Sequence, residues 1–148
     1  MIVGDGSQAA DLKEKVNALG LSASVKFTGK LKYSAIPEYH NMADIFINIP
    51  EYESFGVCVI EAMACEKPVI VSNQGGLKEI VDNTGCGLLV PVHNIGETAA
   101  AIEKLLNNES LGKEMGRKGR TIVTERYNWE DNLDKMMSFY NKFIKRDK

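Results

Sequence analysis

The sequence predicts an α/β fold, a Rossmann-like doubly wound parallel sheet that ends in C-terminal helices. Two observations support this. Short apolar runs alternate with amphipathic segments as far as residue 94, and the remainder of the chain has helical periodicity. Strands separated by helices run parallel, with the helices covering the faces of the sheet. No repeat or linker interrupts the 148 residues, so we expect a single domain over 1–148 that includes terminal helices 95–148.

Each expected element follows from a local signal. Runs of Val, Ile, Leu and Phe predict strands at 2–3, 25–28, 45–49, 69–71 and 88–90. Amphipathic spacing predicts helices at 7–19, 34–42, 76–81, 95–107, 110–125 and 129–145, besides the run that carries Glu61. Gly20 ends the first helix. Pro37 is tolerated in the next one because it falls in the first turn.

Composition and charge exclude several classes of function. The 18 basic and 20 acidic residues nearly balance, so the chain lacks the basic surface of a nucleic-acid-binding protein. No apolar run approaches the roughly 20 residues that span a bilayer, and no secretory signal pattern is visible. Three cysteines without metal-ligand spacing indicate free thiols in a reducing compartment. We therefore expect a cytoplasmic protein without a metal.

The most informative feature is a pair of glutamates, Glu53 and Glu61, on either side of Ser54-Phe55-Gly56-Val57. A strand precedes the pair, so Glu53 lies in a strand-to-helix loop and Glu61 in the following helix. Open α/β sheets bind small ligands at such loops. A lone helical glutamate is usually solvated, but Glu61 has apolar neighbours on both sides, and a carboxylate there needs a partner or a ligand.

Other conspicuous residues have a structural interpretation. His40 and His93 have no identifiable nucleophile or orienting acid beside them, so we expect both to be structural. Trp129 is expected to anchor the last helix by packing. For Gly75-Gly76 two interpretations stay open, a phosphate-binding loop and a loop that permits close helix packing.

Several segments together carry a family resemblance. In order they are 25–29, 43–47, 53–56 with 61–64, 67–70, 75–80, 87–91 and 127–129. With these segments, residues 25–140 resemble the C-terminal lobe of family-four retaining glycosyltransferases, which have the two-lobed GT-B architecture. Glu66 and the pair His93-Asn94 depart from the family pattern without touching its paired glutamates. Relative to that family, we expect the N-terminal lobe and the first strand–helix unit of the C-terminal lobe to be absent.

The resemblance implies roles for individual residues. Glu61 would bind the ribose hydroxyls of a nucleotide sugar. Glu53, the catalytic candidate, would bind hydroxyls of the transferred sugar and position it in the transition state. The rest of the donor would be bound by backbone groups. The sugar and diphosphate would meet the backbone of Ser54, Phe55, Gly56 and Val57. The nucleobase would meet the backbone of Lys30 and Leu31.

The implied function is that of a donor-binding lobe, which transfers a sugar from a nucleotide-sugar donor to an acceptor and is inactive when isolated. A non-catalytic nucleotide-sugar-binding module and a lobe of a GT-B nucleotide-sugar epimerase are alternatives. The implied partners are the donor and the N-terminal lobe or another chain, with no nucleic acid and no cofactor. Peripheral association of the full enzyme with the inner face of the membrane, and a homo-oligomer formed through exposed strand edges, are further options.

The absent first strand has a structural consequence, because that strand is central in the order 3-2-1-4-5-6. We expect the strand at residues 1–4 to pair directly with 45–49, or another chain to fill the gap.

Overall fold

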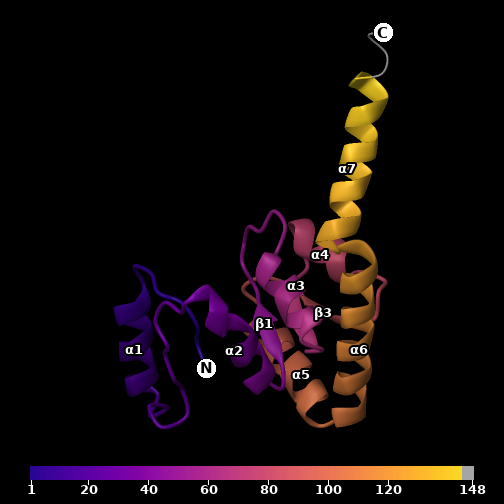
Figure 1. Cartoon of the computed structure of the whole chain (residues 1–148). Helices are drawn as coiled ribbons and strands as arrows, with labels where there is room; N and C mark the ends of the chain where they lie inside the picture. Colours follow the sequence, from indigo (N-terminus) through magenta and orange to yellow (C-terminus); the bar gives the residue numbers. More distant parts are fainter. Residues whose placement is uncertain (145–148) are drawn as a thin grey trace. The chain divides into compact units, whose positions relative to one another are not determined.

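The computed structural model describes residues 1–144 and divides into two compact units, Met1–Tyr39 and His40–Lys148 (Figure 1). The element order is α1 (Ala9–Ala18), η1 (Tyr33–Ala35), α2 (Ile36–Met42), β1 (Phe46–Asn48), α3 (Val57–Ala64), β2 (Val69–Ser72), α4 (Gly75–Val81), β3 (Gly87–Val90), α5 (Ile95–Leu106), α6 (Glu109–Arg126) and α7 (Trp129–Ile144). The predicted helices and the three later strands are confirmed to within about two residues at most boundaries, the usual uncertainty of helix ends. The part of the predicted terminal helices at 145–148 lies outside the described residues.

In the first unit, the expected strands are reduced to two isolated bridges. Ile2 pairs with Phe27 in parallel and Gly4 with Gly29 in antiparallel orientation. Gly4 and Gly29 have φ angles of +116° and +66°, which turn both segments out of the extended conformation and stop the pairing. The Ile2 N–H donates to the Lys26 carbonyl, and β1 is paired with β2. The expected pairing of residues 1–4 with 45–49 would join the two units, and it stays a prediction.

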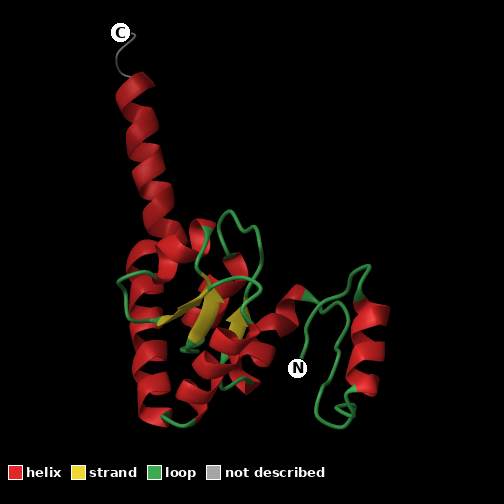
Figure 2. Ribbon diagram, turned by 180° about the vertical axis from the view of Figure 1, so that it is seen from behind, coloured by secondary structure: helices red, strands yellow, loops and turns green. Residues whose placement is uncertain are grey.

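The second unit contains a parallel sheet with the order β1-β2-β3. Ile47 lies beside Ile70, and Ile70 beside Leu88. Every residue of the central strand β2 is buried, as expected for a strand covered on both faces. Figure 2 shows the strands enclosed by helices. The predicted α/β class with a parallel sheet is confirmed.

Two apolar cores lie on opposite faces of β2, because successive side chains of a strand alternate. Val69 and Val71 belong to the core that contains residues of α3 and α4. Ile70 belongs to the other core, with Ala101 and Leu105 of α5. The helix α3 is thereby fixed against one face of the sheet, and this helix carries Glu61.

The C-terminal helices begin at asparagine caps. The side chain of Asn94 accepts the Glu97 N–H at 3.0 Å at the start of α5, and Asn108 accepts the Leu111 N–H at 3.0 Å at the start of α6.

The last helix, α7, has no buried residue. Trp129 is 74% exposed, so the packing role expected for it was wrong. Within residues 1–144, no helix has the length and apolar character needed to cross a bilayer.

Candidate functional site

The candidate site is built on the connection from β1 to α3. The two ends of this connection are tied together, because the Asn48 Nδ2 group donates to Cys58 Sγ at 3.3 Å. Asn48 is the last residue of β1, and Cys58 lies in the first turn of α3. The loop between them contains Glu53, at the carboxyl end of a parallel strand, where α/β proteins bind ligands.

Glu53 folds back onto its own loop. Its Oε1 accepts the Phe55 N–H at 3.1 Å. Hydrogen bonds from the backbone N–H groups of Phe55, Gly56 and Ser54 lower the pKa of the Glu53 carboxyl, although desolvation opposes them. The carboxylate is consequently ionised at neutral pH and lies before the N-terminus of α3, where the helix dipole favours an anion.

Gly56 is the N-cap of α3 and adopts a left-handed conformation, with φ of +79°. A Cβ at this position would lie 2.3 Å from Leu77 Cδ2. The space that its missing side chain leaves is thus filled by a residue of α4. The N-cap residue provides no side-chain cap to this helix start, and a ligand contact at Gly56 and Val57 stays a prediction.

Gly75 and Gly76 pack directly on the loop that carries Glu53. A Cβ on Gly75 would lie 2.6 Å from the carbonyl oxygen of Glu53, and one on Gly76 would lie 2.3 Å from that of Ser54. The Gly76 N–H also donates to the Glu53 carbonyl at 3.2 Å. This confirms the packing interpretation of the double glycine, while the phosphate-binding interpretation stays untested.

Glu61 lies in α3 among buried residues. Val59, Ala62 and Met63 are fully buried, whereas the Glu61 side chain is 25% exposed. Its Oε2 lies 3.9 Å from Nε2 of His40, a residue of α2. The carboxylate of Glu61 therefore has as its neighbour a histidine for which the sequence indicated only a structural role.

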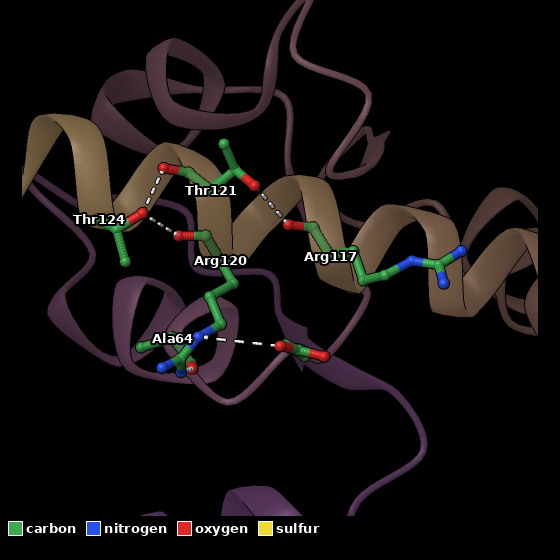
Figure 3. A network of polar contacts seen from close by, with 6 residues as sticks. Ala64, Arg117, Arg120, Thr121 and Thr124 are labelled. Atoms are coloured by element: carbon green, nitrogen blue, oxygen red, sulfur yellow. Dashed lines mark hydrogen bonds and ion pairs between the residues drawn. The ribbon is translucent and has the colours of Figure 1, made fainter.

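The far end of α3 is held by α6 (Figure 3). The Arg120 guanidinium donates to the Ala64 carbonyl and lies 3.8 Å from Glu66 Oε1. A cation at a helix C-terminus interacts favourably with the helix dipole. Arg120 thus stabilises the helix that carries Glu61. Arg117, one turn earlier, extends away from this contact (Figure 3).

The structure brings together most, not all, of the predicted site residues. Glu53, Ser54, Phe55 and Gly56 lie in the connection from β1 to α3, and Val57 and Glu61 lie in α3 itself. Phe55 is 53% exposed and packs edge-on against Tyr127, with the ring centroids 5.9 Å apart. Lys30 and Leu31 belong to the other unit, Met1–Tyr39, and their nucleobase contact stays a prediction. Residues 1–144 contain no group of three or more His, Cys, Asp or Glu arranged to hold a metal ion.

Comparison with known proteins decides the family. The family model described as "Glycosyl transferases group 1" matches residues 1–122. The chain belongs to the glycosyl transferases group 1 family. The N-acetyl-alpha-D-glucosaminyl L-malate synthase of Bacillus anthracis is 30% identical over 148 residues, which is 100% of this chain and 38% of that protein. A GDP-mannose-dependent alpha-(1-6)-phosphatidylinositol monomannoside mannosyltransferase of Mycobacterium tuberculosis is 31% identical and covers 94% of this chain and 38% of its own length.

Solved structures of glycosyltransferases have the same fold. Sucrose-phosphate synthase from Thermosynechococcus elongatus superposes with a TM-score of 0.85 at 30% identity, over 97% of this chain and 38% of that one. Anabaena HepE in complex with UDP and glucose superposes with a TM-score of 0.87 at 25% identity, over 95% of this chain and 39% of that one. The group 1 chain described here thus spans 38% of the length of the relatives compared above.

Proposed function

We propose that this chain is the donor-binding lobe of a retaining glycosyltransferase, which transfers a sugar from a nucleotide-sugar donor to an acceptor. The observation that supports the proposal most is the position of Glu53 and Glu61. Glu53 lies in the connection from β1 to α3, at the carboxyl end of a strand of a parallel sheet, and Glu61 lies in the helix α3 that follows this connection. Membership of the group 1 family gives this edge its expected ligand, a sugar nucleotide.

Glu61 is proposed to bind the ribose. An ionised carboxylate has two oxygens that act only as hydrogen-bond acceptors, so it matches a pair of neighbouring hydroxyl groups. The 25% exposure of its side chain leaves it accessible to such a ligand, while its buried neighbours fix the helix beneath it. Hydrogen bonds to an ionised group are among the stronger ones.

Glu53 is proposed to act at the transferred sugar. Its lowered pKa keeps it anionic, so it can accept sugar hydroxyls and oppose the positive charge that develops at the anomeric carbon. The N–H groups at the start of α3, which has no side-chain cap, would meet the diphosphate. Ser54 and Phe55 would contribute backbone contacts in the same loop, and Lys30 and Leu31 would meet the nucleobase.

The complex of Anabaena HepE with UDP and glucose supports a nucleotide-sugar donor. The relatives named above act on different acceptors by their names, a malate in one and a phosphatidylinositol monomannoside in the other, so no acceptor is assigned. We propose that a further lobe or another chain supplies the acceptor site. Closure around the donor would then exclude water and favour transfer over hydrolysis.

Calorimetric titration with UDP-glucose, UDP-N-acetylglucosamine and GDP-mannose tests the proposal. At least one donor is expected to bind, and Glu61→Gln is expected to weaken it about 10- to 100-fold, the equivalent of a lost charged hydrogen bond. Glu103→Gln, which changes an exposed glutamate of α5, is the matched control and should leave the affinity unchanged.

The same panel separates the alternatives. Failure of every donor to bind at millimolar concentration would overturn the donor-lobe proposal. Binding without turnover agrees with an inactive isolated lobe, whereas hydrolysis or transfer by this chain alone would contradict the inactivity. Recovery of a donor with an inverted sugar centre, detected by proton NMR, would instead indicate an epimerase lobe.

A further inference from the structure

The imidazole of His40 has a buried nitrogen whose hydrogen bonding is not satisfied. The residue is 7% exposed, and its Nε2 has no hydrogen-bond partner among residues 1–144. A buried polar atom without a partner costs about 1–3 kcal/mol. Such a group is retained at this cost when a ligand or a neighbouring side chain completes its hydrogen bonding.

The surroundings of His40 direct this nitrogen toward Glu61. Nε2 lies 3.9 Å from Glu61 Oε2. The ring is held edge-on against Phe46 of β1, with the centroids 5.2 Å apart and the planes at 61°. Lys67, from the loop after α3, donates to the Asn41 carbonyl at 3.0 Å beside it. The imidazole is therefore fixed, and the partly exposed Glu61 side chain is the group that can move.

The 3.9 Å separation is longer than a hydrogen bond, which needs about 2.7–3.2 Å between an N–H and an oxygen. A small torsional adjustment of the Glu61 side chain can close a gap of this size. Burial lowers the pKa of His40, although the negative charge of Glu61 opposes this and Lys67 reinforces it. The ring is consequently neutral at pH 7 and carries a single N–H, which Nε2 can offer to the carboxylate.

We infer that His40 is a positioning residue for Glu61: its Nε2–H donates to Glu61 Oε2 and holds the carboxylate in the orientation that receives the two ribose hydroxyls. This inference rests on the proposed function, which assigns the ribose to Glu61. Each carboxylate oxygen has two lone pairs, so Oε2 accepts from the imidazole and from a ribose hydroxyl together. Binding groups held by a buried hydrogen bond lose less freedom when the ligand arrives.

Three substitutions of His40 separate the effect of the Nε2 hydrogen-bond donor from the effect of the aromatic ring. In His40→Gln the amide nitrogen occupies about the position of Nε2, whereas in His40→Asn it lies nearer to Nδ1; His40→Phe keeps an aromatic ring but no donor. Each variant is titrated with UDP, GDP and ADP and with their 2′,3′-dideoxy counterparts, which lack both ribose hydroxyls. The ratio of the two affinities measures how well the hydroxyls are recognised, and circular dichroism checks the fold.

The wild type is expected to prefer the ribonucleotide at least tenfold. His40→Phe and His40→Asn should reduce this preference about three- to tenfold, the effect of one neutral hydrogen bond. They should leave the affinity for the dideoxy nucleotide unchanged, and His40→Gln should retain the preference. If His40→Phe does not fold, the Gln and Asn variants decide the matter by the same ratio.

The outcomes for the two proposals differ. One outcome would overturn the role of His40 and leave the donor site intact. In that outcome the wild type and all His40 variants prefer the ribonucleotide equally, and only Glu61→Gln loses this preference. A wild type that binds nucleotides but does not distinguish them from the dideoxy forms would overturn the ribose role of Glu61, and that of His40 with it. A wild type that binds no nucleotide would overturn the donor lobe itself.

Discussion

Gly76 lies so close to Ser54 that a Cβ atom on Gly76 would stand 2.3 Å from the Ser54 carbonyl oxygen. The contact is backbone to backbone, so no flexible side chain can yield to relieve it. Gly76→Ala is expected to lower the free energy of unfolding by about 1–3 kcal/mol, the usual cost of overpacking. It should also weaken binding of the donor, because the displaced segment carries Glu53. Chemical denaturation and donor titration measure the two effects.

The matched control is Gly96→Ala in the first turn of α5. A Cβ at Gly96 would meet only Asn94 Oδ1 at 3.6 Å, an ordinary contact distance. Since alanine favours helices over glycine, this variant should be as stable as the wild type or slightly more stable. Equal stability of Gly76→Ala and Gly96→Ala would contradict the close approach of Gly76 to Ser54.

Arg120 is expected to stabilise α3 from its C-terminal end. Arg120→Ala removes the hydrogen bond to the Ala64 carbonyl and the ion pair with Glu66. Because the side chain is 54% exposed, the loss should be modest, about 1 kcal/mol by chemical denaturation. Arg117→Ala, on the same exposed stretch of α6, should change the stability by less than half of that. A larger loss of stability in Arg117→Ala than in Arg120→Ala would contradict a stabilising role for the contact between Arg120 and α3.

The pH dependence of the Glu53 turn has a definite sign. Backbone N–H donors lower the pKa of Glu53 in the folded chain, so the stabilisation is fully present above the unfolded value of about 4.3. It is lost as the pH falls through the lower, folded value. An NMR titration should show the Phe55 amide signal changing below the range of an ordinary glutamate. A midpoint at or above the ordinary value would refute the hydrogen bond to Phe55.

Acid should destabilise the second unit through His40. Burial lowers the pKa of His40. The negative charge of Glu61 opposes this effect, and the positive charge of Lys67 adds to it. The unfolded chain therefore binds a proton more readily, and stability declines as the pH falls from the unfolded value of about 6.5 through the folded one. The Tm of the wild type should decrease more steeply over this window than that of His40→Phe. Parallel Tm curves would be evidence against a buried neutral imidazole.

Sequence periodicity was sufficient for most of the fold. The apolar runs and the amphipathic spacing located α3 to α7 and the parallel strands, because buried strands and amphipathic helices each impose their own spacing. Sequence periodicity was less informative where tertiary contacts decide whether a segment forms a strand or is buried. Residues 2–3 and 25–28 have strand-like composition, yet they form isolated bridges. The exposure of Trp129 also could not be read from its hydrophobicity.

The candidate site was predictable in part. Glu61 stood out because a carboxylate on an apolar helix requires an explanation, and Glu53 stood out as its pair in the family resemblance. His40 gave no comparable signal, since a lone histidine in a short helix has no periodicity that reveals its neighbour in α3. The packing of Gly75 and Gly76 on the Glu53 loop was one of two interpretations that the sequence left open, and only backbone distances could favour it.

The three anchors of the segment from Asn48 to Ala64 have a practical consequence for protein engineering. One anchor is internal, between Asn48 and Cys58, and the others come from Gly76 and Arg120 outside the segment. A transplant of this segment into another group 1 chain would carry both carboxylates but only one of the three anchors. Recipients should therefore be chosen for a glycine and an arginine already present at the corresponding positions.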